Sequence, residues 1–128
     1  MSLSANTHRR IVWTVRVLLA VAFGAAGAAK LGGAAPMVQI FELIGIGQWF
    51  RYVTGIVEVA GAVLLLVPAT AFFGGLLLCV TMAFGVATHL LLIGGNPVPA
   101  IVLGALSGFV AYRLRRTDSV LTQPRVAR

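Results

Sequence analysis

The feature that most constrains this chain is a series of long apolar runs that fill most of its 128 residues. An α-helix needs about 20 mainly apolar residues to cross a hydrocarbon layer about 30 Å thick. The chain is 59% hydrophobic and only 10% charged, which is far from the composition of a water-soluble domain. The sequence therefore predicts an all-α membrane protein, a four-transmembrane-helix bundle with spans at about residues 11–31, 52–67, 71–93 and 97–112.

A fifth apolar segment, about residues 36–44, is too short to cross a membrane. Pro36 suits the first turn of a helix, and Gly45 suits its end. Its apolar residues recur at the spacing of one helix face: Met37, Ile40, Phe41 and Ile44. The polar residues Gln39 and Glu42 lie between them. We therefore expect a short interfacial helix between the first and second spans.

The positive charge of the chain is concentrated at its two ends. The net charge is +7, and of the ten Lys and Arg residues only Lys30 and Arg51 lie between residues 17 and 112. Lys and Arg accumulate on the cytoplasmic side of membrane proteins. We therefore expect a multi-pass protein of the cell membrane with both termini cytoplasmic: a basic N-terminus at residues 1–10 and a basic tail at residues 113–128, loose from Thr117.

This charge pattern also bears on partners. Basic flanks on apolar spans are explained by topology and anionic headgroups, so a lipid bilayer is the expected partner and nucleic acid is not. Small residues recur every four positions on two spans: Ala20, Gly24 and Ala28, and then Ala100, Gly104 and Gly108. Such stripes let helices approach closely, and we expect them to pack within the chain rather than to form a homo-oligomer.

Several cofactor chemistries are poorly supported by the sequence. Cys79 is the single cysteine, so one chain cannot carry a dithiol pair. Haem held by two histidines needs two within the membrane, whereas His8 lies in the N-terminal segment. No Cys or His cluster has the spacing of a metal site. We expect no covalent cofactor and no metal.

Besides Arg16, which we group with the basic N-terminal flank, the ionisable residues within the spans are Lys30, Glu58 and His89. Each is a candidate site residue because an isolated charge in a bilayer costs at least about 2.5 kcal/mol. Lys30 ends the first span, Glu58 lies in the second and His89 lies near the end of the third. By helical rise all three lie in the outer half of the bundle. Thr54 shares a helix face with Glu58, and Arg51 follows one turn further out.

These residues predict a ligand pocket lined by the first three spans and covered by segment 36–44. Two interpretations of the pocket stay open. In one, it binds a quinone or a lipid headgroup, since Lys30 and His89 can donate to ring carbonyls while Glu58 moves protons. In the other, Lys30 and Glu58 form a structural ion pair that fixes helix register.

Three short motifs, one in each of the first three spans, carry a family resemblance: Gly27-Ala-Ala-Lys30-Leu31, Gly55-Ile-Val-Glu58-Val-Ala-Gly61 and Thr88-His89-Leu90. Their order and spacing resemble the DoxX-like family of small four-helix membrane proteins. The resemblance implies a four-helix bundle with Lys30, Glu58 and His89 as its polar signature. Members resemble a subunit of a thiosulfate:quinone oxidoreductase, while a eukaryotic branch acts as assembly chaperones for acetylcholine receptors.

Three functions follow as hypotheses. The first is a membrane subunit that binds a quinone or lipid headgroup and works with a redox protein partner. The second is a non-enzymatic chaperone or scaffold that holds client helices on its glycine-rich faces. The third is a small proton-coupled transporter built around Glu58.

Overall fold

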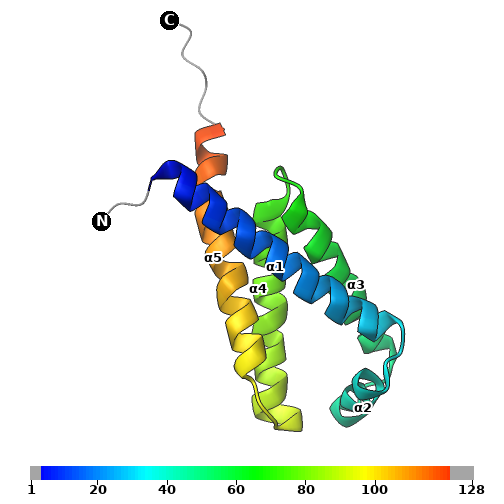
Figure 1. The fold of residues 1–128 in the computed structure, drawn as a ribbon. Helices are drawn as coiled ribbons and strands as arrows, with labels where there is room; N and C mark the ends of the chain where they lie inside the picture. Colours follow the sequence, from blue (N-terminus) through cyan, green and yellow to red (C-terminus); the bar gives the residue numbers. More distant parts are fainter. Residues whose placement is uncertain (1–3, 122–128) are drawn as a thin grey trace, which may run out of the picture.

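The computed structural model describes residues 4–121, with side chains through Arg115, as a bundle of helices (Figure 1). The helices are α1 (Ala5–Leu31), α2 (Ala35–Ile44), α3 (Trp49–Leu66), α4 (Ala71–Thr88), the π-helical turn η1 (His89–Ile93) and α5 (Val98–Leu121). No strand occurs among residues 4–121. The predicted all-α fold with a short helix between the first two spans is confirmed.

Four of these helical segments are long and apolar enough to cross a bilayer: Ala5–Leu31, Trp49–Leu66, Ala71–Ile93 and Val98–Arg115. Large apolar side chains on their outer faces remain exposed, including Leu18, Val21, Leu91 and Leu92. A water-soluble protein rarely exposes so continuous an apolar surface. The chain is therefore a multi-pass membrane protein, with lipid as the solvent of these faces.

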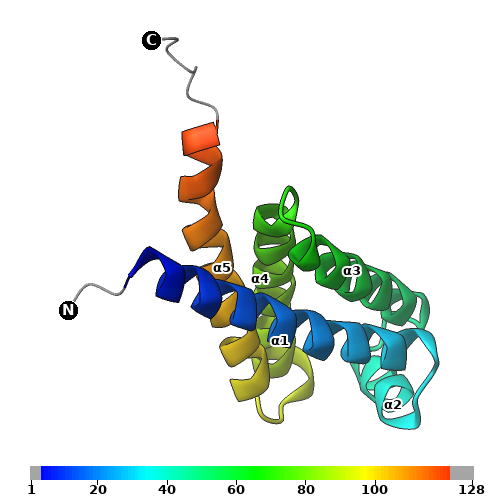
Figure 2. The same ribbon diagram turned by 45° about the horizontal axis from the view of Figure 1, so that its top comes forward.

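The helices pack in the order α1, α3, α4, α5, and each is antiparallel to its neighbour (Figure 1). α1 and α3 run side by side in both views (Figures 1 and 2). The start of α1 and the end of α5 lie at one end of the bundle, here called the terminal end. α2 and η1 lie at the opposite end, here called the site end.

The apolar core of the bundle is made by side chains from α1, α3, α4 and α5. Its buried members are Leu19, Ala20, Phe23, Ala62, Leu65, Leu78 and Val110. Their places along the helices put most of this core nearer the terminal end. Close packing there leaves the site end as the part of the bundle where the helices can diverge.

The small residues of α1 do not pack as the sequence stripe predicted. A Cβ atom added at Gly24 would meet nothing within 4 Å, and Ala28 is exposed. A Cβ at Gly27 would instead lie 2.8 Å from the carbonyl oxygen of Gly55 on α3. The predicted Ala20, Gly24 and Ala28 face is thus wrong for the latter two residues, because α1 is rotated to place Phe23, Gly27 and Lys30 toward α3.

The stripe on α5 does pack within the chain. A Cβ at Gly104 would lie 3.0 Å from the Cβ of Met82, and one at Gly108 would lie 3.2 Å from Cys79 Sγ. On the α4 side, a Cβ at Gly75 would lie 2.9 Å from the Ser107 carbonyl oxygen. These contacts confirm the prediction of close intramolecular packing for this helix.

Both ends of the chain are more helical than the sequence suggested. α1 already begins at Ala5, where Ser4 Oγ accepts a hydrogen bond of 3.2 Å from the Thr7 amide. α5 continues to Leu121, so the segment expected to be loose from Thr117 is helical that far. The rest of the predicted tail, and residues 1–3, lie outside the described residues.

Candidate functional site

Lys30 and Glu58 form an ion pair, which was part of one of the two interpretations that the sequence left open. Lys30 Nζ lies 3.0 Å from Glu58 Oε1 and 3.1 Å from Oε2. The two side chains are 14% and 3% exposed, so the pair is withdrawn from its surroundings. The close approach of Gly27 to Gly55 brings α1 and α3 near enough for this contact. The pair therefore links α1 to α3, as the structural interpretation of the pocket requires.

Arg51 was predicted as a ligand-binding residue, but its side chain makes its contacts with other residues of the protein. Its guanidinium is buried, donates through Nε to Gln48 Oε1 at 2.7 Å and through Nη1 to the Lys30 carbonyl oxygen, and lies 4.4 Å from the centre of the Tyr52 ring. The Lys30 carbonyl belongs to the last turn of α1, where carbonyls lack partners within the helix. Gln48 also donates to the Val38 carbonyl oxygen at 3.1 Å. Arg51 therefore joins the ends of α1 and α3 and, through Gln48, α2.

Arg16 makes the matching contact at the terminal end, and the sequence interpretation missed it by grouping Arg16 with the basic flank. Its side chain is only 3% exposed, and Nε donates to the Leu65 carbonyl oxygen at 2.7 Å. Its guanidinium carbon lies 3.7 Å from the centre of the Trp13 ring, while Nη2 is buried without a partner among the described residues. Leu65 lies in the last turn of α3, so Arg16 caps α3 as Arg51 caps α1.

A cavity of about 680 Å³ lies at the site end and is lined by residues of all the helices and of η1. Its wall is mainly apolar, with Phe23, Phe41 and Phe50 among its members. The polar residues on its wall are Lys30, Thr54, Glu58, Thr81, Thr88 and His89. Four of the five predicted ligand-binding residues therefore border one space, and Arg51 does not.

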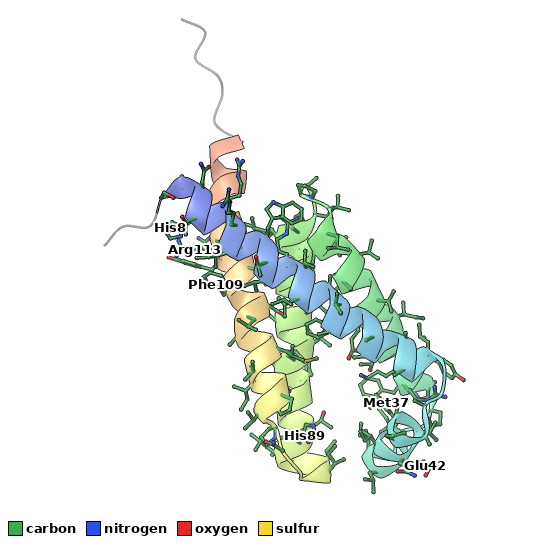
Figure 3. The ribbon with its side chains drawn as sticks, viewed as in Figure 1. His8, Met37, Glu42, His89, Phe109 and Arg113 are labelled. Atoms are coloured by element: carbon green, nitrogen blue, oxygen red, sulfur yellow. The ribbon has the colours of Figure 1, made fainter. Side chains whose placement is uncertain are left out.

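α2 forms one wall of this cavity. The four residues of its predicted apolar face, Met37, Ile40, Phe41 and Ile44, all line the space, whereas Gln39 and Glu42 are exposed. Figure 3 places Met37 and Glu42 on one side of the site end and His89 on the other, far from His8 and Arg113. The cavity is thus wider than the predicted pocket, because α5 also contributes Pro99, Ala100 and Leu103.

His89 borders the cavity but makes no hydrogen bond to the ion pair. Its Nδ1 lies 2.8 Å from the Gly94 carbonyl oxygen. Gly94 and Gly95 adopt φ values of 67° and 80°, which turn the chain back beneath the imidazole ring. His89 also opens the π-helical turn η1. Such turns are rare and occur often at functional sites.

The predicted site residues did not include Thr81 or Thr88, although Thr88 belongs to the motif that contains His89. Both line the cavity from α4, seven residues apart. A spacing of seven places two side chains on the same helix face, and Thr88 directly precedes His89. That helical spacing was the available signal.

The fold and this site define a class: a small multi-pass membrane protein with a mainly apolar cavity and a buried ion pair at one end of its bundle. The model of the DoxX-like family matches residues 14–113, and the chain belongs to that family. No curated protein and no solved structure gives a significant match to this chain.

Proposed function

We propose that this protein is a membrane subunit that binds a quinone, or another amphiphile with a polar head, in the cavity at the site end. The observation that carries the proposal is a single space of about 680 Å³ with mainly apolar walls that also includes the Lys30–Glu58 pair and the His89 ring. Ligand sites are typically about 300–1,000 Å³ and combine apolar walls with a few polar groups. The volume and the lining suit a small ring that carries an apolar chain.

The residues of the cavity fit such a ligand. Phe50 and Phe84 line the cavity and are not buried, so they offer aromatic surfaces against which a planar ring can pack. Glu58 and His89 add polar groups to the same wall, beside which the head of a ligand would lie. A bound quinone would supply two-electron redox chemistry, while the residues of this chain bind it, orient it and exclude water.

An associated redox protein belongs to this proposal. Cys79, the single cysteine, packs between α4 and α5 against Gly108, so one chain has no dithiol pair with which to pass electrons. Electrons for a bound quinone would therefore come from another polypeptide. A partner that docks on the site end would lie next to the cavity.

The structural role of the ion pair is compatible with ligand binding, so the test must separate the two. Ala26 lines the cavity, whereas its neighbour Ala25 is exposed on the lipid face of the same helix. Ala26→Phe fills part of the cavity and leaves the ion pair in place. Ala25→Phe adds the same ring outside it and is the matched control.

The experiment is a binding titration in nanodiscs with decylubiquinone and decylubiquinol, followed by native mass spectrometry. We expect at least one form to bind the parent protein and the Ala25→Phe variant alike, and Ala26→Phe to weaken that binding by about tenfold or more. Equal binding by both variants would place the ligand elsewhere on the protein. Binding of neither form by the parent would exclude the quinone proposal.

The two alternative functions receive less support from the packing. A scaffold that grips client helices through the glycine face of α5 would need that face to be free, but Gly104 and Gly108 contact α4. A proton carrier at Glu58 would need a carboxylate that alternates between partners, and here both of its oxygens contact Lys30.

A further inference from the structure

The polar groups on the cavity wall are nearly all hydrogen-bond acceptors, and we infer that the ligand is recognised as a donor: an amphiphile whose head carries a hydroxyl group. This inference rests on the proposed function and specifies the ligand class of the same cavity. It follows from the acceptor to which each polar side chain on the wall already donates its hydrogen bond.

The three threonine hydroxyls on the wall are all committed to the backbone. Thr54 Oγ1 donates to the Phe50 carbonyl oxygen, Thr81 Oγ1 to that of Leu77 and Thr88 Oγ1 to that of Phe84, each at 2.8 Å. A hydroxyl has one hydrogen to donate and two lone pairs that accept. Each threonine therefore has only acceptor capacity left for a ligand.

The His89 ring likewise has its donor engaged and an acceptor left over. A carbonyl oxygen can only accept, so the 2.8 Å contact with Gly94 requires the proton to be on Nδ1. In the neutral ring Nε2 is then an unprotonated acceptor. Nε2 has no hydrogen-bond partner among the residues that the structure describes.

The ion pair adds acceptors as well. The Glu58 carboxylate has only acceptor oxygens, and each carries further lone pairs beyond its contact with Lys30. Lys30 is the charged donor of the wall, and its ammonium group already contacts both oxygens. An ammonium group has three N–H donors, so Lys30 keeps one beyond its two contacts with Glu58. A ligand that offers only carbonyl oxygens would find this one donor against five acceptor groups, so most of its polar contacts would be poorly matched.

A hydroxyl head matches this wall because it can donate to His89 Nε2 or to a threonine oxygen. Two kinds of membrane molecule carry one on an apolar body: a reduced quinone, and a neutral lipid with a free hydroxyl such as a diacylglycerol. Their shared chemistry is the donor. The oxidised quinone has the same ring and chain but lacks it, and it provides the discriminating comparison.

The test measures dissociation constants in nanodiscs for two matched ligand pairs whose members differ in their hydroxyl donors, by two in the first pair and by one in the second. The first pair is decylubiquinol and decylubiquinone, and the second is dioctanoylglycerol and its acetylated ester. We expect the donor member of at least one pair to bind about tenfold more tightly than its partner, as one or two hydrogen bonds would give. A preference within the first pair would identify the ligand as a quinol, and a preference within the second would identify it as a neutral lipid.

Two variants connect the preference to the wall. His89→Phe and Thr88→Val remove acceptors, and each should reduce the preference to less than about threefold. Thr14→Val is the control, since Thr14 Oγ1 makes the same bond to a carbonyl four residues earlier, that of Arg10, away from this cavity. Loss of preference in Thr14→Val as well would overturn the inference.

The remaining outcomes separate this inference from the proposed function. If the acceptor ligands bind as tightly as their donor partners or more tightly, the donor rule is wrong while the quinone- or lipid-binding function stands. If none of the four probes binds, both fail together. A preference for the donor that survives His89→Phe combined with Thr88→Val would also overturn the assignment to these acceptors.

Discussion

Arg16 and Arg51 act as a pair at opposite ends of the same two helices. Arg16 lies in the first half of α1 and Arg51 in the first turn of α3, and each donates to a carbonyl in the last turn of the other helix: Arg16 to Leu65, and Arg51 to Lys30. The last carbonyls of a helix lack internal donors and lie at the negative end of its dipole. Within a membrane, where water cannot supply the missing donor, a guanidinium in this position stabilises both helix ends.

Replacing Arg16 with methionine tests this role. Met keeps a long apolar stem but leaves the Leu65 carbonyl without its buried donor, so we expect a loss of about 1.5–3 kcal/mol in the free energy of unfolding. SDS titration in mixed micelles, followed by circular dichroism, measures it. Arg10→Met is the matched control, because Arg10 is exposed on the same helix and should change stability by less than about 0.5 kcal/mol. Equal stabilities would refute the capping role.

The burial of Arg16 could have been predicted from the phase of its helix. Arg16 and Lys30 are fourteen residues apart. At 3.6 residues per turn this separation is close to four full turns, so the two side chains lie within about 40° of one another around α1. Since Lys30 must face Glu58, Arg16 must face α3 too. Counting it as a flanking charge ignored this geometry.

At the scale of elements, the spans were predictable because hydropathy alone decides which segments can enter a bilayer. The faces through which the helices contact one another were less predictable. Gly24 belongs to the period-four stripe of small residues, whereas Gly27 has Phe23 and Leu31 four residues away, so a search for that period selects the wrong glycine. The ion pair would have settled it, since Gly27 is on the Lys30 face and Gly24 is not.

The two glycines of α1 make a matched pair for testing this packing. Gly27→Ala places a methyl group 2.8 Å from the Gly55 carbonyl oxygen, so we expect a loss of about 1–3 kcal/mol as α1 and α3 separate. Gly24→Ala meets nothing within 4 Å and should be neutral or stabilising by less than about 1 kcal/mol. Unfolding in SDS gives both values. Equal effects would mean that α1 is rotated from its described position.

The cavity illustrates what one sequence could not give. The meeting of Lys30 and Glu58 was predictable from the cost of isolated charges, and the α2 face from its helical spacing. The contribution of α5 was not, since Pro99, Ala100 and Leu103 carry no polar signal. The hydrogen-bond direction at His89 also depends on a turn, Gly94-Gly95, whose path is set by positive φ angles.

For the molecule as a whole, most of the core lies nearer one end of the bundle and the cavity lies at the other, and Phe23 belongs to both. Buried apolar side chains gather nearer the terminal end, and the space that could hold a ligand opens at the other. The ends of the bundle differ in the same way in their charges. At the site end Lys30 is paired with Glu58 and Arg51 is tied to backbone and amide groups, whereas Arg9, Arg10 and Arg115 are exposed at the terminal end.

This asymmetry sharpens the prediction of orientation. Free positive charge stays on the cytoplasmic side, and the cations of the site end are neutralised or buried, so the terminal end should be cytoplasmic and the cavity should open near the opposite face. Cysteine labelling with a membrane-impermeant maleimide tests this. Asn96→Cys, in the turn before α5, should label in intact cells, whereas Asn6→Cys at the start of α1 should label only after permeabilisation. The parent protein is the control, because its Cys79 packs against Gly108 and should stay unlabelled. The reverse pattern would invert the orientation, and labelling of both positions in intact cells would contradict their placement at opposite ends of the bundle.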